Sequence, residues 1–189
     1  YIAAGASLLV LILLVALFLY RRSAGQAEAS RLLNSARSAA ELEAIVEKYP
    51  ASEAAPLALL SLADFLFRQG QYEAAQGRYR RFVESYPEHE SAAFAQMGLG
   101  YCQEALGQLP EALDAYRLVE GKYPGSSLGA EALFNAARIQ NALGSPSEAQ
   151  ITYGLIVSQY PQSAFAASAR EAAARLSARP AASPPVPTP

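Results

Sequence analysis

The chain has 189 residues, of which 52% are hydrophobic and 17% charged, and its 15 basic and 17 acidic side chains give a formal net charge of -2 at pH 7. This balance argues against a nucleic-acid partner, because such binding needs a concentrated basic face. The single cysteine, Cys102, excludes an internal disulfide.

Residues 2–20 form a run of 19 uncharged, mainly apolar residues. At about 1.5 Å per residue, a helix of this length crosses a hydrocarbon core of roughly 30 Å. A cleaved secretory signal is the alternative, but its apolar part is shorter and ends in an Ala-x-Ala-like site, whereas Arg21 and Arg22 follow here. We therefore expect a transmembrane anchor over residues 1–22, with a further segment before Tyr1.

The beginning of this run is rich in small residues. Ala3, Ala4, Gly5, Ala6 and Ser7 would let another helix approach closely. We therefore expect the protein partners to include another membrane protein.

From residue 49 onward the sequence repeats with a period of 37 residues. The pair Tyr-Pro occurs four times, at 49–50, 86–87, 123–124 and 160–161. A constant period of this size, without insertions, is typical of a stacked repeat array. Three further sets keep the same spacing: Gly70, Gly107 and Gly144; Ala75, Ala112 and Ala149; and Tyr79, Tyr116 and Tyr153.

Each repeat is predicted to be a pair of helices. In the first full repeat, Leu59, Leu62 and Leu66 have the three- and four-residue spacing of one apolar helix stripe. Gly70 supplies the left-handed turn that ends this helix, and Pro87 stops the second one. Neither helix can bury its stripe alone, so the repeats must stack. The predicted fold class is therefore all-α, an N-terminal transmembrane helix followed by an α-solenoid of helical hairpins.

The period also divides the chain into segments. A degenerate first repeat is expected at 23–50, directly after the anchor, with a shortened first helix over 27–36 and a second helix over 38–48. Residues 162–178 are expected to form a helix that caps the array. The proline-dense end, 179–189, is expected to be an extended, mobile tail, with a docking peptide as the alternative. Full repeats are expected at residues 51–87, 88–124 and 125–161.

Arg78, Arg80 and Arg81 are the nearest approach to a basic patch, and Glu73 and Glu84 lie close to them in the sequence. A solvated outer helix face is the simpler interpretation. A phosphate or lipid-headgroup site is the alternative, although three arginines with acidic neighbours make a weak field.

Catalytic chemistry has little basis in the sequence. His89, the one histidine, and Cys102 lie thirteen residues apart, and a Cys-His nucleophile is the alternative to a solvated histidine and a small buried thiol. No set of His, Cys or carboxylate residues has metal-ligand spacing, and the glycines come singly at repeat joints rather than in a phosphate-binding loop. We expect no enzymatic activity, no cofactor, no metal site and no small-molecule substrate.

The repeat resembles the tetratricopeptide repeat (TPR). Its departures are a unit of 37 rather than about 34 residues, the lack of an early tryptophan, and Gln103 and Gln140 where an aromatic is usual. The resemblance rests on the Leu-Gly pair, the small residue that opens the second helix, the aromatic of that helix and the closing proline: Leu62-Ala63, Leu99-Gly100 and Ala136-Ala137; Ala75, Ala112 and Ala149; Tyr79, Tyr116 and Tyr153; and Pro87, Pro124 and Pro161.

In TPR arrays the first helices line a concave side that binds partners. The resemblance therefore implies a protein-binding groove, which would suit an apolar helix or an extended segment, with Arg138 and Asn141 available to a carboxylate or backbone oxygen. The alternative is that Leu60, Phe94 and Phe134 pack against neighbouring hairpins. The implied groove residues are Leu57, Leu60, Asp64, Phe67, Arg68, Phe94, Met97, Tyr101, Glu104, Glu131, Phe134, Asn135, Arg138 and Asn141.

The longer unit with Tyr-Pro joints is similar to that of bacterial cell-envelope TPR proteins. A single span followed by such repeats resembles the YfgM-like ancillary subunits of the Sec translocon, which implies the bacterial inner membrane with periplasmic repeats. Arg21 and Arg22 alone favour cytoplasmic repeats by the positive-inside tendency, but the flank before the span is unknown. We therefore expect a membrane-anchored scaffold or adaptor, associated with a translocon or a chaperone. The alternative is a structural subunit of a larger membrane complex.

Overall fold

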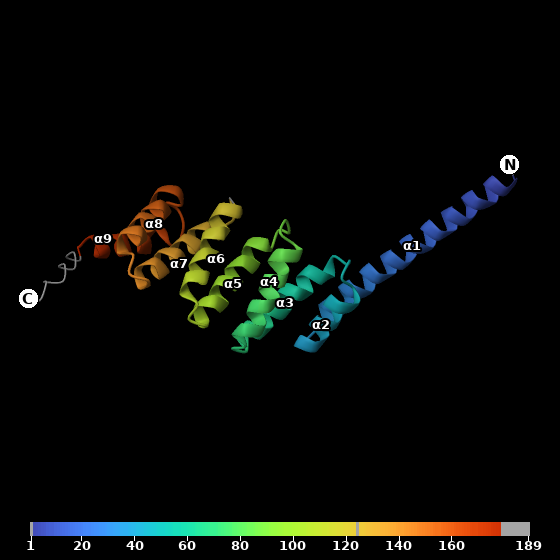
Figure 1. The fold of residues 1–189 in the computed structure, drawn as a ribbon, viewed down its shortest axis with the longest axis horizontal. Helices are drawn as coiled ribbons and strands as arrows, with labels where there is room; N and C mark the ends of the chain where they lie inside the picture. The colour runs from blue at the N-terminus through green and yellow to red at the C-terminus, as the bar shows by residue number, and fades with distance from the viewer. Residues whose placement is uncertain (1, 124, 179–189) are drawn as a thin grey trace, which may run out of the picture. The chain divides into compact units, whose positions relative to one another are not determined.

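The computed structural model of the chain describes residues 2–123 and 125–178, with side chains from Leu13 onward. These residues form nine helices and no strands (Figure 1). They belong to two compact units, Tyr1–Tyr86 and Pro87–Pro189, and each unit is described by itself. Over the described part of the chain, the prediction of an all-helical array of hairpins is confirmed.

The first unit contains α1 (Ile2–Ser35), α2 (Ala39–Lys48), α3 (Ala54–Arg68) and α4 (Tyr72–Ser85). Helix α1 packs against α2 and α3, and α3 also packs against α2 and α4. Figure 1 shows α1 as one long helix that leads without a break to the turn before α2.

Local sequence explains where α2 begins. The Ser38 side chain accepts a hydrogen bond from the Glu41 backbone amide, and the Glu41 carboxylate accepts one from the Ser38 amide. This reciprocal pairing satisfies two amides that the first helical turn leaves without partners. The amide of Arg37 also donates to Glu41, and these backbone hydrogen bonds hold the pKa of Glu41 below its ordinary value.

The second unit contains α5 (Ala92–Ala105), α6 (Leu109–Lys122), α7 (Gly129–Ala142), α8 (Pro146–Gln159) and α9 (Ala166–Ser177). Each helix packs against the next one in the chain. The core is made of alanines interleaved with a few large side chains, of which Tyr116, Val119, Ile139 and Ile156 are fully buried. Small residues bring the helix backbones close together, and the large residues fill the remaining space.

The repeating glycines and tyrosines have separate roles at the joints. Gly107 and Gly144 have φ values of 73° and 84° after the first helix of their repeats, a conformation that side chains with a Cβ rarely adopt. In the second unit, the tyrosines that follow the second helices, Tyr123 and Tyr160, pack against the core, and Tyr160 lies against Gly129. A Cβ added at Gly129 would lie 2.5 Å from the Tyr160 hydroxyl oxygen, so this joint requires a very small residue.

Two predictions concern residues that the structure describes only in part or not at all. The predicted anchor includes residues 1–12, whose side chains are not described, and the proline-rich tail at 179–189 lies wholly outside. Within the described residues, no helix has the length and apolar character that a membrane crossing requires. The end of the predicted anchor is described, and the large apolar side chains of Leu13–Tyr20 are 48–71% exposed.

Candidate functional site

Several predicted groove residues meet between α5 and α7. The Tyr101 hydroxyl donates a hydrogen bond to the Glu131 carboxylate, which joins the two helices. Arg138 on α7 donates to Glu104 on α5 at 2.6 Å and to Asn135 at 3.5 Å. We call these five residues the α5–α7 network, and each of them comes from the first helix of its repeat.

One further member was missed by the sequence analysis. The hydroxyl of Tyr116, on α6, donates to the same Glu104 oxygen at 3.2 Å. The Tyr116 and Tyr101 rings meet edge to face with centroids 5.7 Å apart. The 37-residue spacing indicated that Tyr116 is the aromatic residue of its second helix, and its side chain is indeed buried. This spacing does not indicate which group the Tyr116 hydroxyl contacts.

The contacts of the α5–α7 network and Tyr116 stabilise an ionised Glu104 and un-ionised tyrosines. The hydrogen bond from Arg138 lowers the pKa of Glu104, and the same contact raises the pKa of Arg138. Burial, followed by the nearby carboxylates, raises the pKa values of Tyr101 and Tyr116 well above the ordinary value. At neutral pH the two phenols are therefore neutral donors, and Glu104 is an anion with a partner.

The other predicted groove residues of the second unit have different environments. Phe94 lies on α5 with 47% of its surface exposed, and Asn141 is exposed near the end of α7. Met97 is 2% exposed and belongs to the core, so it does not reach the surface as predicted. Phe134 packs against Tyr153 and Phe165 with ring centroids 5.4 Å apart in both pairs, which agrees with the packing alternative for this residue.

In the first unit, the predicted groove residues lie along α3. Leu57 is 41% exposed, whereas Leu60 is half-buried. Phe67 contacts Tyr72 edge to face, with centroids 5.3 Å apart. The remaining two residues are tied to their own hairpin, because Asp64 accepts a hydrogen bond from the Tyr79 hydroxyl and the Arg68 side chain donates to the Asp64 carbonyl.

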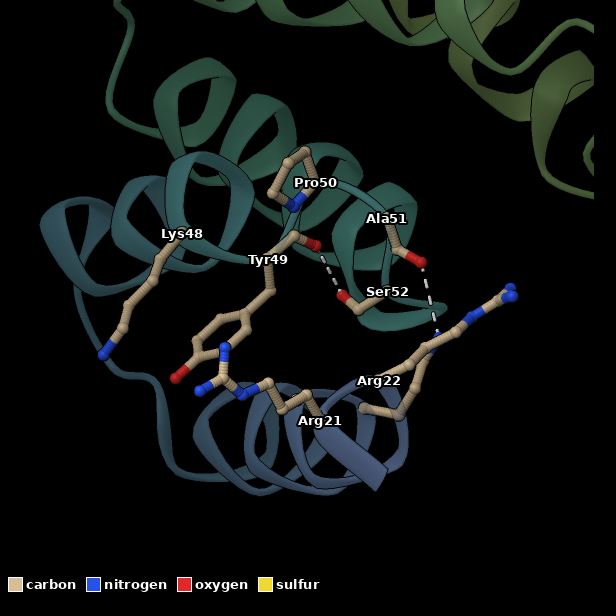
Figure 2. A pocket seen from close by; sticks show the side chains of 9 residues that line it. Arg21, Arg22, Lys48, Tyr49, Pro50, Ala51 and Ser52 are labelled. Atoms are coloured by element: carbon tan, nitrogen blue, oxygen red, sulfur yellow. Dashed lines mark hydrogen bonds between the residues drawn. The ribbon is translucent and has the colours of Figure 1, made fainter. Parts of the chain in front are cut away.

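The first unit also has a hollow that the sequence analysis did not predict. It has a volume of about 180 Å³ and lies between α1 and the joint that connects α2 to α3 (Figure 2). We call it the Tyr49 hollow. Its lining residues are Arg21, Arg22, Gly25, Gln26, Lys48, Tyr49, Pro50, Ala51 and Ser52.

Two of the three arginines on α4 form ion pairs with another helix, and Arg80 is exposed. Arg78 forms an ion pair with Glu43 at 2.9 Å, and Arg81 forms one with Glu47 at 3.0 Å. Both carboxylates belong to α2, so these two arginines join α4 to α2 within the first unit.

The two residues of the alternative Cys-His nucleophile have different environments. Cys102 is fully buried, and the His89 ring accepts a hydrogen bond from the Ser91 amide at 3.0 Å. No group of three or more His, Cys, Asp or Glu side chains in the described part could hold a metal ion.

Comparisons with known proteins agree with this fold. A TPR protein from Parabacteroides merdae is 18% identical, with a TM-score of 0.63 over 82% of this chain and 60% of that one. PcrH from Pseudomonas aeruginosa is 23% identical, with a TM-score of 0.56 over 67% of this chain and 95% of that one. The type III secretion chaperone SycD of Yersinia enterocolitica, solved with a peptide of the translocator YopD, is 22% identical, with a TM-score of 0.53 over 64% of this chain and 88% of that one.

At these identities the similar structures show the fold alone, and no curated protein matches the chain. The sequence itself matches models of the tetratricopeptide repeat at residues 25–75, 60–127 and 131–163. These matches cover more than half of the chain, so the resemblance noted in the sequence is confirmed. The chain belongs to the tetratricopeptide repeat family.

Proposed function

We propose that this protein is a membrane-anchored scaffold whose first-helix face binds an apolar or aromatic segment of a protein partner. The observation that carries the proposal is Phe94, a large aromatic side chain left 47% exposed on the first helix of its repeat. Exposed aromatic side chains beside satisfied polar groups are typical anchors of interfaces. The role is one of binding, with no catalytic step.

The α5–α7 network supports this role by making the helix face rigid. Glu104 and Glu131 already have partners, so a peptide need not neutralise them. The Arg138 side chain remains 48% exposed beside Glu104 and can still donate a hydrogen bond to a further acceptor, such as a peptide carbonyl. The SycD structure, which contains a peptide of YopD, is consistent with peptide binding on this fold.

A photo-cross-linking residue at position 94 tests the binding face. We expect a discrete cross-linked protein from position 94 and none from position 151, because Ile151 is 66% exposed but lies on the second helix of its repeat. For the isolated partner segment, Phe94→Ala should weaken binding by about tenfold, the effect of losing one aromatic anchor. Equal cross-linking from both positions would contradict the proposed face.

The proposed anchor rests on the apolar run at the start of the chain and on the exposed side chains of Leu13–Tyr20. An exposed apolar helix surface of this kind is stable when it is shielded from water, and a bilayer can shield a run of 19 residues. The resemblance to cell-envelope TPR proteins favours the inner membrane of a bacterium with the repeats in the periplasm. Protease added to sealed inner-membrane vesicles, whose cytoplasmic face is outward, should leave the repeats intact. Cleavage there would place the repeats in the cytoplasm instead.

The same membranes distinguish the adaptor from a structural subunit. An adaptor, including one that serves a translocon or a chaperone, should copurify in mild detergent with several substoichiometric partners. One fixed assembly with constant stoichiometry would indicate the structural subunit and would contradict the adaptor.

A further inference from the structure

We propose that the Tyr49 hollow binds the phosphate group of an anionic phospholipid at the membrane surface. This inference rests on the proposed membrane anchor. At about 180 Å³, the hollow is smaller than the roughly 300–1,000 Å³ of pockets that enclose whole metabolites, but it has space for a group of a few atoms.

The charges that line the hollow are all positive. Arg21, Arg22 and Lys48 line it, no carboxylate does, and none of the three cations forms an ion pair within the described residues. In Figure 2 the Arg21 side chain points toward Tyr49, whereas Arg22 points away along the other side of α1, where it shares a second hollow with Glu53. Arg21 and Lys48 are therefore the principal cations, and Arg22 lies at the rim.

Two backbone acceptors in the wall of the hollow already have partners. The Tyr49 carbonyl accepts hydrogen bonds from the Ser52 amide and hydroxyl at 2.9 and 2.7 Å, and the Ala51 carbonyl accepts one from the Gln26 side chain at 3.3 Å. The donors that face the hollow are the Arg21 guanidinium, the Lys48 ammonium and the Tyr49 phenol, with the Arg22 guanidinium at the rim. A set of strong donors with fork-shaped guanidinium groups is suited to a phosphate.

The array contains a second joint of the same kind, which serves as an internal comparison. Lys122 and Tyr123 stand two periods after Lys48 and Tyr49, and each lysine lies over its tyrosine ring, at 5.5 and 5.3 Å from the centroid. The hollow at this later joint is lined by His89 and Glu90 in place of arginines. The lysine and tyrosine are thus a general feature of the joint, whereas the arginine pair without a carboxylate is particular to the Tyr49 hollow.

The location of the hollow favours a lipid over a free anion. Arg21 follows directly after the exposed apolar side chains of Leu13–Tyr20, where an inserted helix would leave the hydrocarbon region. Basic side chains at this level attract anionic headgroups, with an effect of about fivefold in affinity for each. Lys48, 27 residues later in the sequence, is brought to the same level by the packing of α2 on α1.

The test is a titration of the full chain in uncharged detergent with dioctanoyl phosphatidylglycerol, monitored by calorimetry and by the backbone amide shifts of Lys48, Tyr49, Ala51 and Ser52. The double variant Arg21→Gln/Lys48→Gln should bind about 25-fold more weakly, the product of two cation losses. The matched control Arg80→Gln/Lys122→Gln removes the same charge from exposed positions outside the hollow, and its affinity should stay within twofold. Circular dichroism checks that both variants keep their helices.

Three outcomes would overturn the proposal. Equal weakening in the control variant would show a general charge effect, and equal binding of dioctanoyl phosphatidylcholine would show that the anionic headgroup is not recognised. Inorganic phosphate that binds as tightly and displaces the lipid would make the hollow a free-anion site.

Flotation with uncharged phosphatidylcholine vesicles separates this inference from the anchor. If the full chain does not float, the anchor is wrong. If both the full chain and the Arg21→Gln/Lys48→Gln variant float but neither prefers phosphatidylglycerol, only the lipid site is wrong.

Discussion

Gly100 stands at the second position of the TPR Leu-Gly pair, where the other two repeats have alanine, and here the packing leaves no space for a side chain. A Cβ added there would lie 2.6 Å from a ring carbon of Tyr116, which is fully buried and cannot move aside. Gly154, in the middle of α8, has open space around it. The two glycines therefore allow the packing effect to be separated from helix propensity.

We predict that Gly100→Ala lowers the free energy of unfolding by about 1–2 kcal/mol, because overpacking outweighs the gain in helix propensity. Gly154→Ala should raise it by about 0.5–1 kcal/mol, since it gains the propensity without a clash. Urea denaturation of both variants measures the difference. A stabilised Gly100→Ala would mean that Tyr116 is not held against α5.

Two buried glutamines of α5 differ in their hydrogen bonding. Gln96 donates to the Ala115 carbonyl at 3.3 Å, whereas the side-chain oxygen of Gln103 has no hydrogen-bond partner among the described residues. Gln140 stands one period after Gln103: its side-chain nitrogen donates to Glu148 at 3.4 Å, but its side-chain oxygen likewise has no hydrogen-bond partner among the described residues. An unpaired buried acceptor loses its bonds to water without compensation.

We therefore predict that Gln103→Leu raises the free energy of unfolding by about 1 kcal/mol. A leucine is compatible with this position of the repeat, because Leu66 occupies it one period earlier. Gln96→Leu should lower the free energy by a similar amount, since it removes a made hydrogen bond. Thermal and urea unfolding compare the pair, and a destabilised Gln103→Leu would show that its oxygen has a partner after all.

At the scale of helices, the Glu104–Arg138 ion pair connects α5 to α7. Because the pKa of Glu104 is lowered in the folded state, the pair contributes stability above the ordinary carboxyl value of 4.5 and loses it as the pH falls below that value. Arg138 is about half exposed, so screening by water keeps the contribution small.

We predict that Arg138→Gln lowers the free energy of unfolding by about 0.5 kcal/mol at pH 7, and that its effect becomes smaller as the pH is lowered from 4.5 to 3, because Glu104 is then progressively protonated. Urea denaturation at these pH values measures this. In a Glu104→Gln background the effect of Arg138→Gln should not depend on pH, and a persistent pH dependence there would assign the effect to another group.

The helices themselves could largely be predicted from the sequence, because apolar periodicity, glycine stops and Tyr-Pro joints are local signals. The surface could be predicted less well. Met97 was placed on the partner face by the repeat register, but its flexible side chain turns into the core. The Tyr49 hollow joins Arg21 to Lys48 across a helix, a turn and a second helix, so no local pattern indicates their proximity.

At the scale of the whole chain, we predict that removal of residues 1–20 abolishes flotation with phosphatidylcholine vesicles, because it removes the apolar run. The shortened chain should keep the unfolding midpoint of the repeats, since Ala29 is the first buried residue of α1 from Leu13 onward, where its side chains are described. Flotation of the shortened chain would show that another surface binds the membrane.

The unbroken course of α1 has a mechanical consequence. This helix continues from Ile2 to Ser35 and packs against α2 and α3, so no hinge separates its apolar half from the first hairpin. When a bilayer becomes thinner or thicker, an inserted helix accommodates the change by altering its tilt. In the proposed anchored form, such a change in tilt would turn α2 and α3 together with α1, toward or away from the lipid surface.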